Sequence, residues 1–220
     1  MATVIDRLEF AAKLAAGKRV LDIGGRGMPP CDKPGVRGPE LFKQNSEAAG
    51  NSRFAHAYRR IAKNAAEYRV LDVRNEPDVH YVVNLSERGC MEKLHEVLCE
   101  YRPEVILCME TLEHVNYHYE CLNEMAGAIT RYGTSVFITL PNNKNWILNF
   151  LGWNHDHIVA FFDDIAGRFI ERSDLGLHRI EHVACFQKYL WYWWFIYALS
   201  GFQPFSLGFL VKPRDKQGNP

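Results

Sequence analysis

The stretch Arg19-Val20-Leu21-Asp22-Ile23-Gly24-Gly25-Arg26-Gly27 decides the fold of this chain. Val20, Leu21 and Ile23 form a short apolar run around a single acid, which is typical of a parallel strand buried on both faces. The glycines that follow allow a sharp turn with positive φ and leave no Cβ between the backbone and a ligand. In open α/β sheets, ligands bind outside the carboxyl ends of the strands. We therefore predict a ligand-binding turn here, with an ordinary tight turn as the alternative.

Length, charge and cysteine usage narrow the class of protein. A chain of 220 residues can bury one good-sized core, so we expect a single domain over residues 1–220. Its 26 basic and 26 acidic residues cancel, so we expect no nucleic-acid partner. The six cysteines form no CxxC pair, which disfavours a zinc knuckle or a disulfide framework. We expect no metal, because Glu113, His114 and His118 are not in the HExxH order.

The N-terminus and the longest apolar run indicate the localisation of the protein and its relation to membranes. No secretory signal is visible at the N-terminus, so we expect a cytoplasmic protein. The longest apolar run, residues 189–199, is shorter than the roughly 20 residues of a bilayer-spanning helix, so no transmembrane span is expected. We interpret this run as an aromatic helix that is buried or covered by a partner. The alternatives are a lid, a homodimer contact or a peripheral membrane contact.

The rest of the chain alternates strand and helix patterns. Such alternation predicts right-handed βαβ crossovers and a doubly wound parallel sheet. A helix is expected over residues 4–16, an insertion that is a candidate cap over 28–66, and substrate-side elements over 144–200. Further strands are predicted at 68–73, 79–85, 104–109, 135–140, 177–184 and 205–212, and further helices at 91–101, 119–131, 158–172 and 187–199.

Four predicted strands end in polar groups, which would meet at one edge of the sheet. These groups are Asp22, Asp72, Asn84 and Glu110, and the last leads into Leu112-Glu113-His114-Val115. A carboxylate such as Asp72 can accept two hydrogen bonds from a ribose diol. The amide of Asn84 can both donate to and accept from an adenine edge.

With these strand ends, the sequence resembles the class I S-adenosylmethionine-dependent methyltransferases, in particular their type 11/12-like small-molecule branch. The resemblance covers roughly residues 18–142 and is carried by the VLDIGGRG run at 20–27 and the LEHV run at 112–115. It implies a Rossmann-like, mostly parallel seven-stranded sheet with an antiparallel last strand. A helical insertion would follow the first strand, and the aromatic helix would lie near the C-terminus.

The resemblance also implies roles for single residues around S-adenosylmethionine. Asp22 would help hold the ammonium group of the cofactor, and the backbone around Met109 and Glu110 would hold its sulfonium end. The methionine part would lie over the turn made by Gly24, Gly25 and Gly27.

Asp72 would bind the ribose hydroxyls of the same cofactor, and Asn84 with the Leu85 backbone would bind the adenine. Two features depart from the family pattern. Asp72 lies 50 residues after Asp22, so residues 28–66 must be an insertion. Asn84 stands where the family often has an acid, which would weaken the grip on the adenine amino group.

A nicotinamide dinucleotide is the main alternative ligand, and its fingerprint is GxGxxG. Here Gly25-Arg26-Gly27-Met28-Pro29-Pro30 places proline where the third glycine belongs, which disfavours an NAD-dependent enzyme.

Methyl transfer needs an aligned acceptor, and a general base could add about 10²–10⁴-fold. The candidate bases are His114, His155 and His157; the alternative for each is a helix cap or a surface residue. We hypothesise transfer of a methyl group from S-adenosylmethionine to an oxygen or nitrogen of a small metabolite, such as a sugar or a lipid-linked intermediate. The alternative is a non-catalytic cofactor-binding or protein-interaction module.

Overall fold

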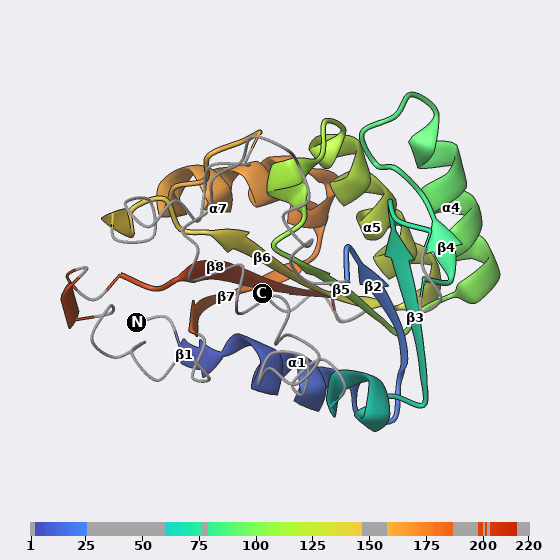
Figure 1. Ribbon diagram of the computed structural model, residues 1–220, viewed down its shortest axis with the longest axis horizontal. Coiled ribbons are helices and arrows are strands. Elements are labelled where there is room, and N and C mark those ends of the chain that lie inside the picture. The colour runs from blue at the N-terminus through green and yellow to red at the C-terminus, as the bar shows by residue number, and fades with distance from the viewer. Residues whose placement is uncertain are drawn as a thin grey trace.

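Eight strands form one sheet, in the order β1-β7-β8-β6-β5-β2-β3-β4 (Figure 1). The computed structural model describes residues 3–25, 60–75, 79–146, 158–186, 198–199, 201 and 203–214. The strands are β1 (Thr3–Asp6), β2 (Arg19–Ile23), β3 (Glu67–Asp72), β4 (Tyr81–Val82), β5 (Val105–Met109), β6 (Ser135–Pro141), β7 (Arg179–Phe186) and β8 (Ser206–Lys212). The helices include α1 (Arg7–Ala15), α4 (Cys90–Tyr101), α5 (His118–Tyr132) and α7 (Asp163–Arg172), with short 3-10 turns η2 (Leu112–His114) and η3 (Asp174–Leu177).

Strand direction puts the carboxyl ends of seven strands on one edge. β8 is antiparallel to both of its neighbours, β6 and β7, and every other neighbouring pair is parallel. This confirms the predicted α/β class and the mostly parallel, Rossmann-like sheet with an antiparallel last strand. The polar residues that follow β2, β3 and β5 therefore meet at the same edge, because these three strands are neighbours in the order β5-β2-β3.

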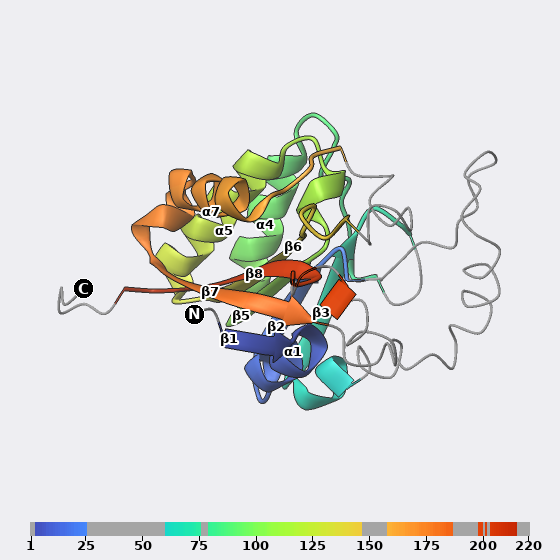
Figure 2. The same cartoon turned by 90° about the vertical axis from the view of Figure 1, so that its left-hand side faces the viewer.

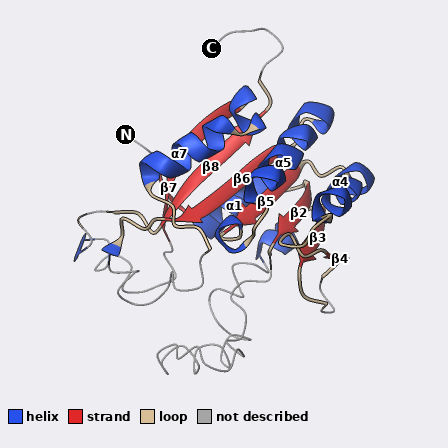
Figure 3. Cartoon of the chain, turned by 90° about the horizontal axis from the view of Figure 1, so that it is seen from above, coloured by secondary structure: helices blue, strands red, loops and turns tan. Residues whose placement is uncertain are grey.

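Helices cover both faces of the sheet. α1 lies under one face, and α4, α5 and α7 lie over the other (Figures 1 and 2). Viewed from above, α7, α5 and α4 lie in a row along the sheet (Figure 3). Because side chains alternate along a strand, β2 contributes Val20 to the apolar cluster on the α1 side and both Leu21 and Ile23 to the cluster on the opposite side. β5 is buried along its whole length, as the central strand of a covered sheet should be.

The N-terminus differs from the prediction of one helix over residues 4–16. Residues 3–6 instead form β1, which pairs in parallel with β7 and adds an eighth strand to the expected seven. The β-branched residues at 3–5 favour an extended backbone. The helix begins only at Arg7, because the Asp6 side chain caps it by accepting a hydrogen bond of 2.9 Å from the Glu9 N–H.

Most other predicted elements begin and end within two residues of their observed bounds. The strand predicted at 79–85 is reduced to Tyr81–Val82 at the sheet edge, and α7 begins at Asp163 rather than at residue 158. Residues 187–197 of the predicted aromatic helix and residues 28–59 of the predicted insertion lie outside the described residues. The cysteines within the described part are all free thiols. None of the helices described there is long and apolar enough to cross a membrane.

Candidate functional site

Asp22 is the next-to-last residue of β2, at the end of the sheet where the polar residues that follow β2, β3 and β5 meet. Its side chain is fully buried. The Tyr68 hydroxyl donates a hydrogen bond to Asp22 Oδ2, and no donor in the described part of the chain reaches Oδ1. Burial raises the pKa of Asp22 to about 7; the Tyr68 hydrogen bond opposes this rise and the nearby Asp72 charge adds to it. The carboxyl therefore changes its charge near neutral pH and has one oxygen available for a cationic group.

The glycine turn after β2 is packed so tightly that side chains are excluded. Gly24 has φ +72°, and a Cβ on it would lie 2.4 Å from Thr111 Oγ1. A Cβ on Gly25 would lie 2.4 Å from Asp22 Cγ. Both glycines are thus required by close approach, as expected of a turn that carries a ligand. Gly27, the third glycine predicted to bind the cofactor, lies outside the described residues.

Thr111 connects this turn to the segment after β5. Its hydroxyl hydrogen-bonds to the Ile23 carbonyl at 3.1 Å and to the Met109 carbonyl at 3.3 Å. Sequence reasoning did not select Thr111, although it directly precedes the LEHV run. The contact depends on β2 and β5 being neighbours, which spacing along the chain does not show.

Asp72, the residue predicted to bind ribose, ends β3 beside this turn and is 6 % exposed. Its Oδ1 accepts a hydrogen bond of 3.1 Å from the Arg74 N–H, and Arg74 Nε lies 3.9 Å away. The turn therefore orients the carboxylate at the carboxyl edge of the sheet.

Asn84, the residue predicted to bind adenine, uses its amide locally. The side-chain Nδ2 donates to Glu87 Oε1 at 2.9 Å, and Oδ1 accepts from the Ser86 N–H at 3.1 Å. Leu85 follows with its side chain buried. The adenine roles of Asn84 and of the Leu85 backbone stay predictions.

An ion pair between a buried arginine and a partly exposed glutamate lies at the carboxyl ends of β5 and β6. Arg7 Nη1 lies 2.9 Å from Glu110 Oε1, and the Arg7 side chain is only 3 % exposed. Thr139 of β6 donates a hydrogen bond of 2.9 Å to the same Glu110 oxygen. Glu110 also adopts φ +54°, a strained conformation for a non-glycine residue that the Glu110 N–H to Thr139 O hydrogen bond of 2.9 Å supports. The sequence does not single out Arg7, because the apolar spacing of residues 4–16 predicts one helix and does not show that β1 pairs with β7.

Glu113 of η2 is a second fully buried carboxyl, and neither of its oxygens has a hydrogen-bond partner in the described part of the chain. Burial, strengthened by the Glu110 charge, raises its pKa well above the usual value, against a smaller opposing effect from Arg7. Burial and the Glu110 charge therefore disfavour the ionised form of Glu113.

The candidate base His114 directly follows Glu113. It is 43 % exposed, and its Nε2 lies 3.9 Å from Glu113 Oε1. The structure thus places His114 next to the strand ends, whereas His155 and His157 lie outside the described residues. Within the described ranges, no group of three or more His, Cys, Asp or Glu side chains is arranged to hold a metal ion.

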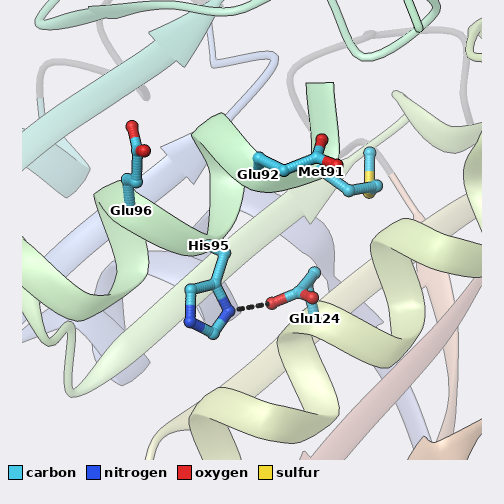
Figure 4. A pocket seen from close by; sticks show the side chains of 5 residues that line it. All are labelled: Met91, Glu92, His95, Glu96 and Glu124. Atoms are coloured by element: carbon cyan, nitrogen blue, oxygen red, sulfur yellow. Dashed lines mark hydrogen bonds and ion pairs between the residues drawn. The ribbon is translucent and has the colours of Figure 1, made fainter. Parts of the chain in front are cut away.

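A pocket of about 300 Å³ lies between α4 and α5 and is distinct from the strand ends (Figure 4). His95 Nδ1 and Glu124 Oε2 approach to 2.9 Å within it. The pocket contains none of the residues predicted to form the site. Its lining is made by Met91, Glu92, His95, Glu96 and Glu124.

Comparisons with known proteins bear on the fold. No protein-family model and no curated protein matches the sequence. Among solved structures, the chain is similar to a SAM-dependent methyltransferase from Archaeoglobus fulgidus, with a TM-score of 0.50, 15 % identity and 94 % of each chain covered. It is also similar to a chain in the complex of the Haloferax volcanii Trm112 methyltransferase activator with a protein designated a methyltransferase. That match has a TM-score of 0.53, 10 % identity, and covers 95 % of this chain and 89 % of the other.

These likenesses extend over nearly the whole chain and concern its fold. The chain has the fold of the class I S-adenosylmethionine-dependent methyltransferases.

Proposed function

We propose that this protein transfers a methyl group from S-adenosylmethionine to an acceptor. The observation that carries the proposal is Asp22, a buried carboxyl beside a turn that excludes side chains, with one oxygen left without a donor among the described residues. A buried carboxyl in this state is stabilised by a cationic or donor group that binds to it. The amino-acid end of S-adenosylmethionine carries such a group, its ammonium.

The neighbouring strand ends fit the rest of the cofactor. Asp72 is oriented by Arg74 and offers a carboxylate for a ribose diol. Asn84 and the Leu85 backbone follow β4, the next strand in the sheet order, and offer amide and backbone groups for an adenine. A dinucleotide is a poorer fit, because Pro30 stands where the third glycine of its GxGxxG fingerprint belongs.

The cofactor supplies a methyl group that is already activated by a cationic sulfur. The protein has to align an acceptor with it, and alignment alone can contribute roughly 7–11 kcal/mol. The side chains of Arg7, Glu110 and Glu113 would form a charged and polar wall of the acceptor site, next to Met109 at the end of β5. We propose His114 as the candidate base, with His155 and His157 as further candidates. The acceptor atom would be an oxygen or nitrogen of a small metabolite, such as a sugar or a lipid-linked intermediate.

Cofactor binding is the first test. Calorimetry with the demethylated product, S-adenosylhomocysteine, is expected to show binding to the wild type. Asp72→Ala should weaken this binding by at least about tenfold, because a charged hydrogen-bond acceptor is lost. Asp174→Ala, which removes an exposed carboxylate in η3, is the matched control and should bind like the wild type. Tight binding of NADH with no binding of the sulfonium cofactor would contradict the proposal.

Catalysis needs a separate test. Extracted metabolites are incubated with the protein and methyl-labelled S-adenosylmethionine, and the labelled product is traced. Transfer that is reduced in His114→Ala but not in His95→Ala would support an enzyme with His114 near the acceptor. Binding without transfer across a broad panel would instead favour a non-catalytic cofactor-binding protein.

A further inference from the structure

Tyr68 has a contact that the proposed roles do not explain. It lies on β3 directly beside Val20 of β2, two residues before Val70, which is the register partner of Asp22. Its hydroxyl nevertheless reaches forward and donates to Asp22 Oδ2. The hydrogen bond fixes one oxygen of the buried carboxyl and leaves Oδ1 for another group.

The groups that face Asp22 are acidic or neutral. Tyr68 and Asp72 approach it from β3. On the β5 side its register partner is the apolar Leu107, while the Cys108 side chain belongs to the cluster on the opposite face. Among the described residues, no arginine or lysine forms an ion pair with Asp22. Tyr68 is thus the one described donor that stabilises the ionised form, and the carboxyl lacks a positive partner from this part of the chain.

We infer that Tyr68 is a positioning residue for Asp22, and that the amino-acid end of the cofactor binds with release of one proton from the Asp22 carboxyl. The inference rests on the proposed function. In the empty site, the Asp22 O–H bond is largely intact below neutral pH. When the cofactor ammonium arrives, that bond breaks, the proton passes to the solvent buffer, and the resulting carboxylate pairs with the ammonium. The Tyr68 hydroxyl keeps its own proton and continues to donate to Oδ2.

A pH dependence of affinity follows from this coupling. Burial raises the pKa of Asp22 to about 7, so the protein must lose a proton to bind below that pH and need not do so above it. The dissociation constant of S-adenosylhomocysteine should fall about tenfold for each pH unit gained below pH 7 and level off above it. S-adenosylhomocysteine is the suitable probe, because its ammonium group keeps its proton over this range.

Calorimetry in two buffers of different ionisation enthalpy measures both quantities. For the wild type, we expect about one proton released per S-adenosylhomocysteine bound near pH 6 and about none near pH 8. Asp22→Asn should bind more weakly with no proton release at any pH. Circular dichroism at each pH confirms that the protein under test is folded.

The variant Tyr68→Phe tests whether Tyr68 positions the Asp22 carboxyl or only contributes to folding. Without its donor, the Asp22 carboxylate is less stable, so the levelling of affinity should move to higher pH and affinity at pH 7 should fall about three- to tenfold. Tyr101→Phe is the matched control: its hydroxyl donates to the carbonyls of Val20 and Glu67 on the same two strands, at 3.2 Å each, and its removal should leave the pH profile unchanged.

Two results would overturn the inference while leaving the proposed function intact. One is tight wild-type binding of S-adenosylhomocysteine that is independent of pH and releases no proton. The other is a Tyr68→Phe profile that levels off at the same pH as the wild type and Tyr101→Phe. A folded wild type that binds no S-adenosylhomocysteine at any pH would instead contradict the proposed function itself.

Discussion

Asp22 and Glu113 are both fully buried carboxyls at the carboxyl edge of the sheet, but they are surrounded differently. Asp22 has a hydroxyl donor, Tyr68, and its pKa is raised only to about 7. Glu113 has no hydrogen-bond donor among the described residues and lies near the negative charge of Glu110, so its pKa is raised well above the usual value. The Tyr68 hydroxyl therefore favours ionisation of Asp22, whereas burial and the Glu110 charge disfavour ionisation of Glu113.

This difference divides the site into two regions. The Asp22 region, with Tyr68 and Asp72, is suited to a cationic amino-acid group and a ribose. The Glu113 region, with Arg7 and Glu110, already contains a paired charge and can present neutral or paired polar groups to an acceptor. The buried acids lower the stability of the folded protein in both regions, as functional sites often do.

Arg7→Ala should have the largest effect on stability, because it removes the positive charge from the Glu113 region. Glu110, which is 27 % exposed and keeps its Thr139 hydrogen bond, would lose its charged partner next to the buried Glu113. This costs up to about 3–5 kcal/mol, the range for fully buried pairs. Urea unfolding at pH 7 measures the loss. The double variant Arg7→Ala/Glu110→Gln should recover a large part of it. Equal stability of the single and the double variant would mean that the ion pair contributes little.

Glu113→Gln tests whether Glu113 is neutral in the folded protein. A buried acid with a raised pKa binds a proton on folding, so its contribution to stability falls as pH rises from the unfolded pKa to the folded pKa. Glutamine is neutral at every pH and avoids this cost. At pH 8 the variant should therefore be more stable than the wild type, and at pH 4 the two proteins should be alike. Urea unfolding over pH 4–9 checks this, and a wild type whose stability does not decline with pH would contradict it.

Asp22→Asn is the corresponding test in the other region. The pKa of Asp22 is raised from 3.8 to about 7, so the wild type loses stability between about pH 4 and pH 7 and no more above that range. At pH 8 the variant should be about 2–4 kcal/mol more stable than the wild type without cofactor. It should also bind S-adenosylhomocysteine more weakly, so stability and binding change in opposite directions. A variant that is less stable than the wild type at pH 8 would mean that Asp22 is ionised and satisfied in the empty site.

The sequence predicts the Asp22 region better than the Glu113 region, for physical reasons. Asp22, Gly24 and Gly25 lie within one strand and the turn that follows it, so the backbone conformation they need can be predicted from consecutive residues. Tyr68 reads only as a β-forming residue, because its contact with Asp22 depends on the Val20–Tyr68 register across the long insertion at 28–66. Element order and strand direction follow from periodicity, whereas such registers do not.

The position of Arg7 could not be predicted from the sequence, because it depends on a strand pairing between the two ends of the chain. The apolar spacing of residues 4–16 fits one helix, yet β1 forms at its start because β7, from the far end of the chain, provides a parallel partner. Arg7 then follows directly from a strand end and comes to the carboxyl edge of the sheet. A partner distant in sequence thus determines that a charged residue lies beside Glu110 instead of in solvent.

Thr111→Val tests the connection between the two regions and should give the smallest effect. Thr111 hydrogen-bonds to the Ile23 carbonyl at 3.1 Å, against the turn that contains Gly24, and it directly precedes the Glu113 segment. Valine keeps the shape and loses the hydroxyl, so unfolding should cost about 1 kcal/mol less, the net value of one hydrogen bond. Thr111→Ser keeps the hydroxyl and serves as the control. If the hydroxyl holds the two regions in register, Thr111→Val should also weaken S-adenosylhomocysteine binding more than Thr111→Ser does; equal affinities would show that each region holds its geometry independently.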